Sequence, residues 1–137
     1  MSDAILIVDD DEDFVYLTRR RLTRDGWAGA IDWVPDGEAA LTYLRHRLGV
    51  LAVGALPRLM LVDINMPGMG GFELLGALEV LFEHHAIEPP PPVVVMASSS
   101  RLESDRIRAR ACPFVHDFLT KPISGPALRA CLLDASA

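Results

Sequence analysis

The 137-residue sequence lacks the marks of a membrane-spanning or secreted protein. No apolar run approaches the roughly 20 residues that a membrane-spanning helix requires. The first apolar run, Ile5–Val8, has four residues and leads directly into acidic residues, unlike a secretion signal. Only two cysteines are present, Cys112 and Cys131, and they favour reduced thiols over a disulfide framework. These absences predict a cytoplasmic protein.

Positive charge is also scarce. The formal net charge is −6, which argues against a nucleic acid-binding surface. The sequence has no internal repeat and no low-complexity tail, and its length suits one domain with a sizeable core. We therefore expect a single domain over residues 1–137, without an effector domain, direct contact with nucleic acid or membrane insertion.

The stretch from Leu59 to Gly68 is the one around which the other motifs can be arranged. Four apolar residues run into Asp63, and a turn rich in proline and glycine follows. Such a run is typical of a buried strand in a parallel sheet. A buried charge is costly, so Asp63 belongs at the carboxyl end of the strand, the edge where open α/β sheets bind ligands. Taken alone, the stretch is equally compatible with an Asp63 that only caps the turn.

A second apolar run, Ile5–Val8, ends in a run of acidic residues. If the two runs form neighbouring parallel strands, Asp9, Asp10 and Asp63 converge at one edge of the sheet. Carboxylates that close raise one another's pKa unless a cation lies between them. A few hard oxygen ligands, with room left for water and phosphate, suit Mg²⁺ better than a closed calcium site. Residues 11–13 are instead expected to start the next helix, where negative charge is favoured.

A third motif supplies a positive charge. The stretch Asp117–Thr120 has the composition of a short strand, and it ends in Lys121 because Pro122 stops it. Lys121 would then lie at the same edge of the sheet as the carboxylates. An ammonium group there is a point charge suited to a phosphoryl oxygen.

Together these motifs resemble the receiver domain of two-component response regulators. The resemblance covers nearly the whole chain and is carried by Asp9–Asp10, by Asp63 with Met66, Pro67 and Gly71, and by Lys121–Pro122. It implies that Asp63 accepts a phosphoryl group from a phosphohistidine of a sensor histidine kinase or a histidine phosphotransfer protein. It implies a Mg²⁺ ion held by Asp9, Asp10, Asp63 and the backbone carbonyl of Asn65. It also implies that Lys121 contacts the phosphoryl group.

The hydrophobic pattern predicts alternating strands and helices. Strands are expected at residues 5–8, 30–34, 59–63, 93–96 and 114–119, and helices at 12–25, 38–48, 72–82, 102–111 and after Ser124. This order predicts a three-layer α/β fold of the flavodoxin type, a (βα)5 unit with a parallel sheet in the order 2-1-3-4-5. The first and third strands then meet at the switch point of the sheet, where the repulsion argument also places the acidic residues.

The resemblance also implies a Ser or Thr hydroxyl that bonds the phosphoryl group from the end of the fourth strand. Counting from Pro92 puts Ala97 at this position, whereas counting back from Lys121 puts Ser98 there. Only a hydroxyl can bond a phosphoryl oxygen, so we expect Ser98 to be the switch residue. One of the two serines after it, Ser99 or Ser100, is expected to cap the next helix.

Phe118 stands where the family carries a switchable aromatic residue, although a buried phenylalanine is equally typical of an ordinary core.

Phosphorylation is expected to bias the surface of the fourth helix, fifth strand and fifth helix, which would bind a downstream protein target or form a homodimer. The arginines within residues 19–24 form either a solvated helix face or a contact with a partner.

Two other classes of function compete with a phosphoacceptor regulator. An aspartyl-phosphate hydrolase also uses an aspartate nucleophile and Mg²⁺, but such enzymes typically have a second aspartate two residues later, where this chain has Asn65. A binding module that works without phosphorylation would not need the complete set of Asp9, Asp10, Asp63 and Lys121. We therefore expect no turnover of an external substrate.

Overall fold

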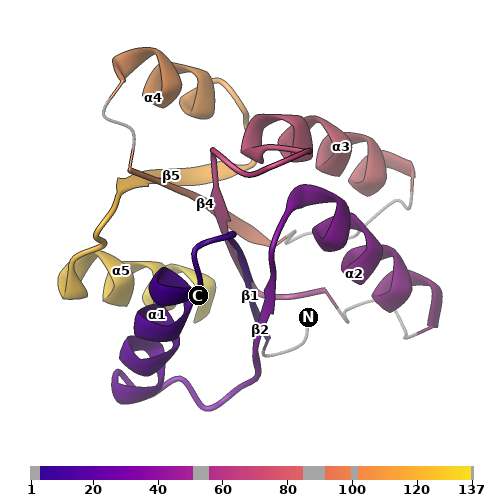
Figure 1. Cartoon of the computed structure of the whole chain (residues 1–137). Helices are drawn as coiled ribbons and strands as arrows, with labels where there is room; N and C mark the ends of the chain where they lie inside the picture. Colours follow the sequence, from indigo (N-terminus) through magenta and orange to yellow (C-terminus); the bar gives the residue numbers. More distant parts are fainter. Residues whose placement is uncertain (1–3, 51–55, 85–91, 100–101, 137) are drawn as a thin grey trace.

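The computed structural model of the chain describes residues 4–50, 56–84, 92–99 and 102–136 (Figure 1). Strands and helices alternate throughout: β1 (Ile5–Val8), α1 (Glu12–Arg24), β2 (Ile31–Val34), α2 (Gly37–Val50), β3 (Leu59–Asp63), α3 (Gly71–His84), β4 (Val93–Ser98), α4 (Glu103–Arg110), β5 (Val115–Thr120) and α5 (Gly125–Ser136). In the described parts of the chain, no helix is long and apolar enough to cross a membrane.

The five strands form one parallel sheet in the order β2-β1-β3-β4-β5, which confirms the predicted fold. Val8, the last residue of β1, is level with Val62 of β3 on one side and with Val34 of β2 on the other. The carboxyl ends of β1 and β3 therefore meet side by side in the middle of the sheet.

Alternation along each strand divides the core into two layers, because successive side chains point to opposite faces. In β1, Ile5 and Ile7 pack with buried residues of α1 and α5. Leu6 and Val8 pack on the other face, against residues of α2, α3 and α4. Figure 1 shows this division, with α1 and α5 on one side of the sheet and the other three helices opposite. Both faces of the sheet are thus covered, as its apolar strands require.

The boundaries of several elements differ from the predicted ones. The helix α2 continues to Val50, and β4 continues to Ser98, two residues beyond the predicted end of that strand. The pairing of β4 with β5 shifts between Val94 and Val95, where His116 is the extra residue of a bulge. Counting along the sequence cannot anticipate such a bulge, since it changes the number of residues that reach the carboxyl edge.

The predicted helix caps are only partly correct. Asp11 caps α1, because its Oδ1 accepts hydrogen bonds from the backbone N–H groups of Asp13 at 3.0 Å and Phe14 at 3.2 Å. The serine cap expected for α4 is wrong as far as Ser99 is concerned. The cap of α4 is Leu102, which offers no side-chain hydrogen bond, and the first turn relies on acidic residues instead. Ser100 lies outside the described residues.

The end of the chain agrees with its sequence pattern. The hydroxyl of Ser124 accepts a hydrogen bond from the backbone N–H of Ala127 at 3.2 Å and so caps α5. Cys112 and Cys131 are both free thiols, as predicted. Cys131 lies in the layer under α5, and burial raises the pKa of its thiol to about 11. It is therefore a core residue rather than a reactive thiol.

Candidate functional site

The three predicted acidic residues lie together at the carboxyl edge of the sheet. Asp63 is the last residue of β3, and Asp9 and Asp10 directly follow β1. Each offers a carboxylate oxygen, and these oxygens all lie within 4.8 Å of one another. Asp9 and Asp63 are buried, with exposed fractions of 1% and 6%, whereas Asp10 is exposed. The cluster thus has two buried carboxylates and one that opens to solvent.

Lys121 brings a positive charge to the same cluster. It is the only lysine in the sequence. It directly follows β5, and its backbone N–H donates to the carbonyl of Ser98 at 2.8 Å. Its Nζ donates to Asp9 Oδ2 at 2.6 Å and lies 3.6 Å from Asp63 Oδ1. The ammonium group also lies 4.3 Å from the centre of the Phe14 ring, a cation–π distance.

The electrostatics of the site leave Asp63 poorly stabilised as an anion. Burial raises the pKa of Asp63 from its ordinary value of 3.8 to about 6. Lys121 opposes this rise, and the neighbouring Asp9 and Asp10 add to it. A cation between the carboxylates would remove much of the remaining repulsion. Hard carboxylate oxygens in this number fit Mg²⁺.

The backbone that follows Asp63 explains why glycine stands at positions 68 and 71. The N–H of Gly71 donates to the carbonyl of Ile64 at 2.8 Å, which draws the start of α3 against the end of β3. A Cβ atom at Gly71 would overlap the carbonyl oxygen of Asp63, so only glycine fits. Gly68 has a φ of +71°, a conformation that favours glycine, and so allows the turn after Asp63.

Two backbone N–H groups also point at the buried carboxylates. The N–H of Asp11 donates to Asp9 Oδ1 at 2.9 Å, and the N–H of Asn65 lies 3.4 Å from Asp63 Oδ1. Asn65 itself is exposed in the turn after β3. That the Asn65 carbonyl binds a metal ion stays a prediction, as do the chemical roles of the other site residues.

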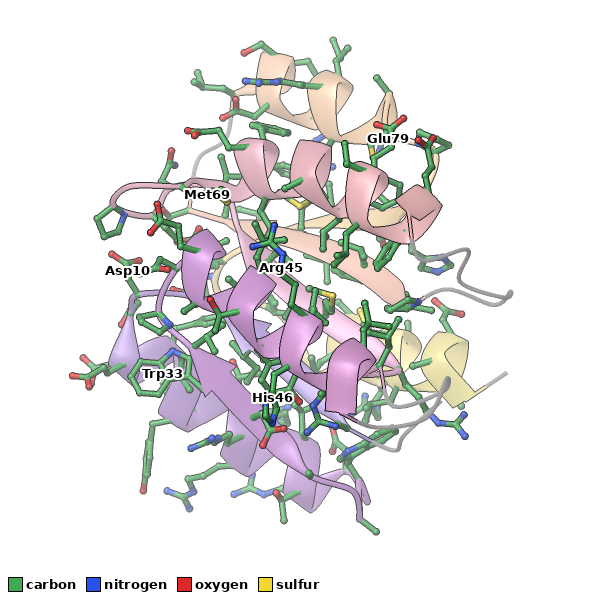
Figure 2. The ribbon with its side chains drawn as sticks, turned by 90° about the vertical axis from the view of Figure 1, so that its right-hand side faces the viewer. Asp10, Trp33, Arg45, His46, Met69 and Glu79 are labelled. Atoms are coloured by element: carbon green, nitrogen blue, oxygen red, sulfur yellow. The ribbon has the colours of Figure 1, made fainter. Side chains whose placement is uncertain are left out.

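Trp33 is a site residue that the sequence reasoning missed. Its indole N–H donates to the backbone carbonyl of Asp9 at 2.7 Å. Figure 2 shows Trp33 and Asp10 along the same edge of the molecule. The sequence did offer one signal. Trp33 is an aromatic donor near the end of the second strand, and the predicted sheet order places this strand beside the first strand. The bond fixes the segment that carries both Asp9 and Asp10.

The register of β4 bears on the predicted switch residue. Asp63 pairs with Ala97, and Met96 pairs with Phe118. Because side chains alternate, Ser98 shares a face with Met96 and Phe118, while Ala97 shares one with Asp63. Ser98 is fully buried and is the last residue of the strand. Its hydroxyl and Phe118 thus lie on one side of the sheet, and their role as a switch stays a prediction.

Comparison with known proteins agrees with this geometry. The family model of the response regulator receiver domain matches residues 5–133. The chain belongs to this family. The acidic cluster of Asp9, Asp10 and Asp63 is typical of the phosphoacceptor site of receiver domains. Receiver domains are generally signalling modules rather than turnover enzymes, and membership implies interaction with histidine kinases or phosphotransfer proteins.

Individual relatives extend the match over most of this receiver domain. The probable methanogenesis regulatory protein FilR2 of Methanothrix harundinacea is 36% identical over 120 residues, which are 88% of this chain and 72% of FilR2. The response regulator PleD of Caulobacter vibrioides is 34% identical over 132 residues, 95% of this chain and 25% of PleD. The crystal structure of a two-component response regulator from Cytophaga hutchinsonii has a TM-score of 0.82 and 28% identity, and the match covers 98% of this chain and 97% of that one.

Proposed function

We propose that this receiver domain is phosphorylated on Asp63 by a phosphohistidine and acts as a phosphorylation-dependent regulator or relay. The observation that carries the proposal is the meeting of three carboxylates with the only lysine of the chain at one edge of the sheet. A site built only for stability would not gather repelling charges around a buried aspartate. Membership of the receiver family supports the same function.

The residues present fit a Mg²⁺ ion. Asp9, Asp10 and Asp63 would hold it through carboxylate oxygens, and the carbonyl of Asn65 would add another hard ligand. When bound, the ion would neutralise negative charge on the oxygens of the transferred phosphoryl group. The exposure of Asp10 leaves solvent access for the water ligands that Mg²⁺ retains.

The chain's own residues account for the transfer step. A carboxylate oxygen of Asp63 attacks phosphorus in line, so a P–O bond forms as the P–N bond of the phosphohistidine breaks. The electron pair of the broken bond stays on the imidazole nitrogen. Lys121, 3.6 Å from Asp63 Oδ1, would contact an oxygen of the phosphoryl group. For Ser98 to bond another oxygen after phosphorylation, the end of β4 would have to turn, because its side chain lies on the face opposite to that of Asp63. Hydrolysis of the acyl phosphate by water then restores the free carboxylate.

The output would pass through the face formed by α4, β5 and α5. Phe118 of β5 is buried, and the guanidinium of Arg106 on α4 lies 5.1 Å from the centre of its ring. A movement of Phe118 would therefore change the contact between β5 and α4. We propose that this face binds a downstream protein target in the cytoplasm or a second copy of the chain.

Intact-mass spectrometry after incubation with acetyl phosphate and Mg²⁺ tests the function. We expect the mass of one phosphoryl group on the wild-type chain and none on Asp63→Asn. Equal labelling of the two proteins would refute the assignment of Asp63. No labelling of either protein would refute the phosphoacceptor function itself.

A further inference from the structure

The ammonium group of Lys121 is contacted from three sides, and one of the contacts is an aromatic ring. Its Nζ donates to Asp9 Oδ2 at 2.6 Å and lies 3.6 Å from Asp63 Oδ1. The centre of the Phe14 ring lies 4.3 Å from the same nitrogen. The two carboxylates belong to the acidic cluster, but phosphoacceptor chemistry does not by itself require a ring at this place.

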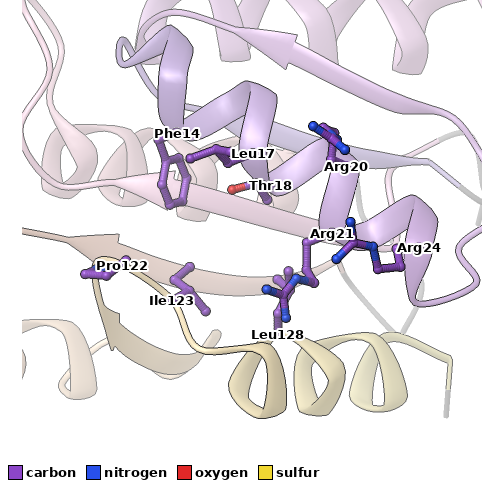
Figure 3. A pocket seen from close by; sticks show the side chains of 9 residues that line it. All are labelled: Phe14, Leu17, Thr18, Arg20, Arg21, Arg24, Pro122, Ile123 and Leu128. Atoms are coloured by element: carbon purple, nitrogen blue, oxygen red, sulfur yellow. The ribbon is translucent and has the colours of Figure 1, made fainter.

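The first turn of α1 fixes the position of Phe14. The backbone N–H of Phe14 donates to Asp11 Oδ1 at 3.2 Å, and the N–H of Asp11 donates to Asp9 Oδ1 at 2.9 Å. One turn of the backbone therefore sets both the carboxylate and the ring that contact the ammonium group. Figure 3 shows the ring pointing from α1 towards the connection after β5, where Pro122 and Ile123 lie.

The ring also covers the ammonium group. Phe14 lines a cleft of about 360 Å³ between α1 and α5, and Lys121 does not line it. The side chain of Lys121 is only 13% exposed. The attraction between a cation and a ring is stronger where the cation has lost part of its water, so this contact should contribute more than one at the surface.

The contacts account for the three N–H donors of the ammonium group. One donates to Asp9, and a second faces the ring of Phe14. The third is left on the side of Asp63, where the separation of 3.6 Å is too long for a strong hydrogen bond. Asp9 alone would let the ammonium group rotate about a single hydrogen bond, whereas Asp9 and the ring together define the direction of the third donor.

We propose that Phe14 is a positioning residue for phosphoryl transfer. The face of its ring orients the ammonium group of Lys121 so that the remaining N–H points at an oxygen of the phosphoryl group entering at Asp63. The proposal rests on the proposed function, because that function assigns the phosphoryl contact to Lys121.

Ring fluorination separates this role from ordinary packing. Each fluorine withdraws electron density from the face of a ring and weakens its attraction for a cation, while the size of the side chain changes little. Phenylalanine with one, two or three ring fluorines is therefore placed at position 14 of the full chain. At saturating Mg²⁺, we expect the initial rate of labelling by acetyl phosphate to fall with each fluorine, by about tenfold with three.

Phe72 is the matched control position. Arg108 lies 4.2 Å from the centre of its ring, a similar contact on the opposite face of the sheet from Phe14. The same fluorinated residues at position 72 should leave the rate of labelling unchanged. Two ordinary substitutions complete the series: Phe14→Tyr keeps the ring and should be labelled at nearly the wild-type rate, and Phe14→Leu should be labelled about tenfold more slowly.

The side chain of Lys121 reports the contact without any phosphoryl donor. Because the chain has only one lysine, isotope-labelled lysine gives a single set of side-chain signals in the NMR spectrum. The ring current of Phe14 should shift the Hε signal upfield in the wild type and in Phe14→Tyr. In Phe14→Leu this signal should return towards the position of an unfolded chain.

Four results would overturn the role of Phe14. These are a labelling rate that does not respond to fluorination at position 14, an equal fall on fluorination at position 72, equal labelling rates of Phe14→Leu and Phe14→Tyr, and a Lys121 signal at the same position in the wild type and Phe14→Leu. Failure of acetyl phosphate to label the wild-type chain would instead contradict the proposed function, so the two failures are distinguishable.

Discussion

Replacing Asp63 with asparagine should stabilise the metal-free protein. Asp63 is 6% exposed, and burial raises its pKa from 3.8 to about 6. At about 1.4 kcal/mol for each pKa unit, this rise means that ionisation of Asp63 destabilises the folded state by roughly 3 kcal/mol. The isosteric amide of Asp63→Asn removes the charge, so we expect its free energy of unfolding to exceed the wild-type value by about 2–3 kcal/mol above neutral pH.

The pH dependence follows from the direction of the pKa shift. A carboxyl group with a raised pKa in the folded state binds more protons there than in the unfolded state. Its contribution therefore lowers the stability of the wild type as pH rises from about 3.8 to about 6. The advantage of Asp63→Asn should be complete at pH values above this window and absent below it. Mg²⁺ should stabilise the wild type more than the variant, because it binds the folded carboxylate cluster.

Urea unfolding in the presence of a chelator, at several pH values on both sides of this window, measures the effect. Glu79→Gln is the matched control, since it removes one negative charge at an exposed position on α3 (Figure 2). Its effect should stay within about 0.5 kcal/mol. If the wild type is more stable than Asp63→Asn at neutral pH without metal, the claim that ionised Asp63 destabilises the folded state is refuted. A stability gain that does not vary with pH would refute its electrostatic origin.

Three further variants test individual residues. Asp10→Ala should lower Mg²⁺ affinity at least about tenfold by calorimetry, because it removes a ligand; unchanged affinity would contradict the site. Trp33→Phe should weaken Mg²⁺ binding about tenfold, since the Asp9 carbonyl loses its indole donor, whereas Trp27→Phe, at the other end of α1, should not. With beryllofluoride standing in for the phosphoryl group, Ser98→Ala should lose the amide chemical-shift response in α4 and β5 that Ser99→Ala retains. The reverse result would assign the hydroxyl to Ser99.

The framework of the site could be predicted because its residues mark the ends of apolar strands. Asp9 and Asp63 each follow a short apolar run, and Lys121 precedes a proline that ends the last strand. In a parallel sheet these ends must meet at one edge. Charge and strand composition are therefore sufficient to predict that the carboxylates and the lysine lie together.

The missing details depend on contacts between distant parts of the chain. The hydrogen bond from Trp33 to Asp9 joins residues on neighbouring strands, and nothing in the local pattern around either one indicates it. The bulge at His116 decides how far β5 reaches beside β4 and so affects any count back from Lys121 to the serines. The start of α4 at Leu102, which offers no side-chain hydrogen bond as a cap, likewise differs from the serine cap that residue preferences indicate.

The central claim is that Asp63 forms an acyl phosphate, and mapping that bond to one residue tests it most directly. Borohydride reduces an aspartyl phosphate to homoserine, whereas a free carboxylate does not react. After treatment with acetyl phosphate, Mg²⁺ and borohydride, peptide mass spectrometry should find homoserine at position 63 and at no other aspartate. Homoserine at Asp9 or Asp10 instead, or intact aspartate at all three positions, would contradict the account.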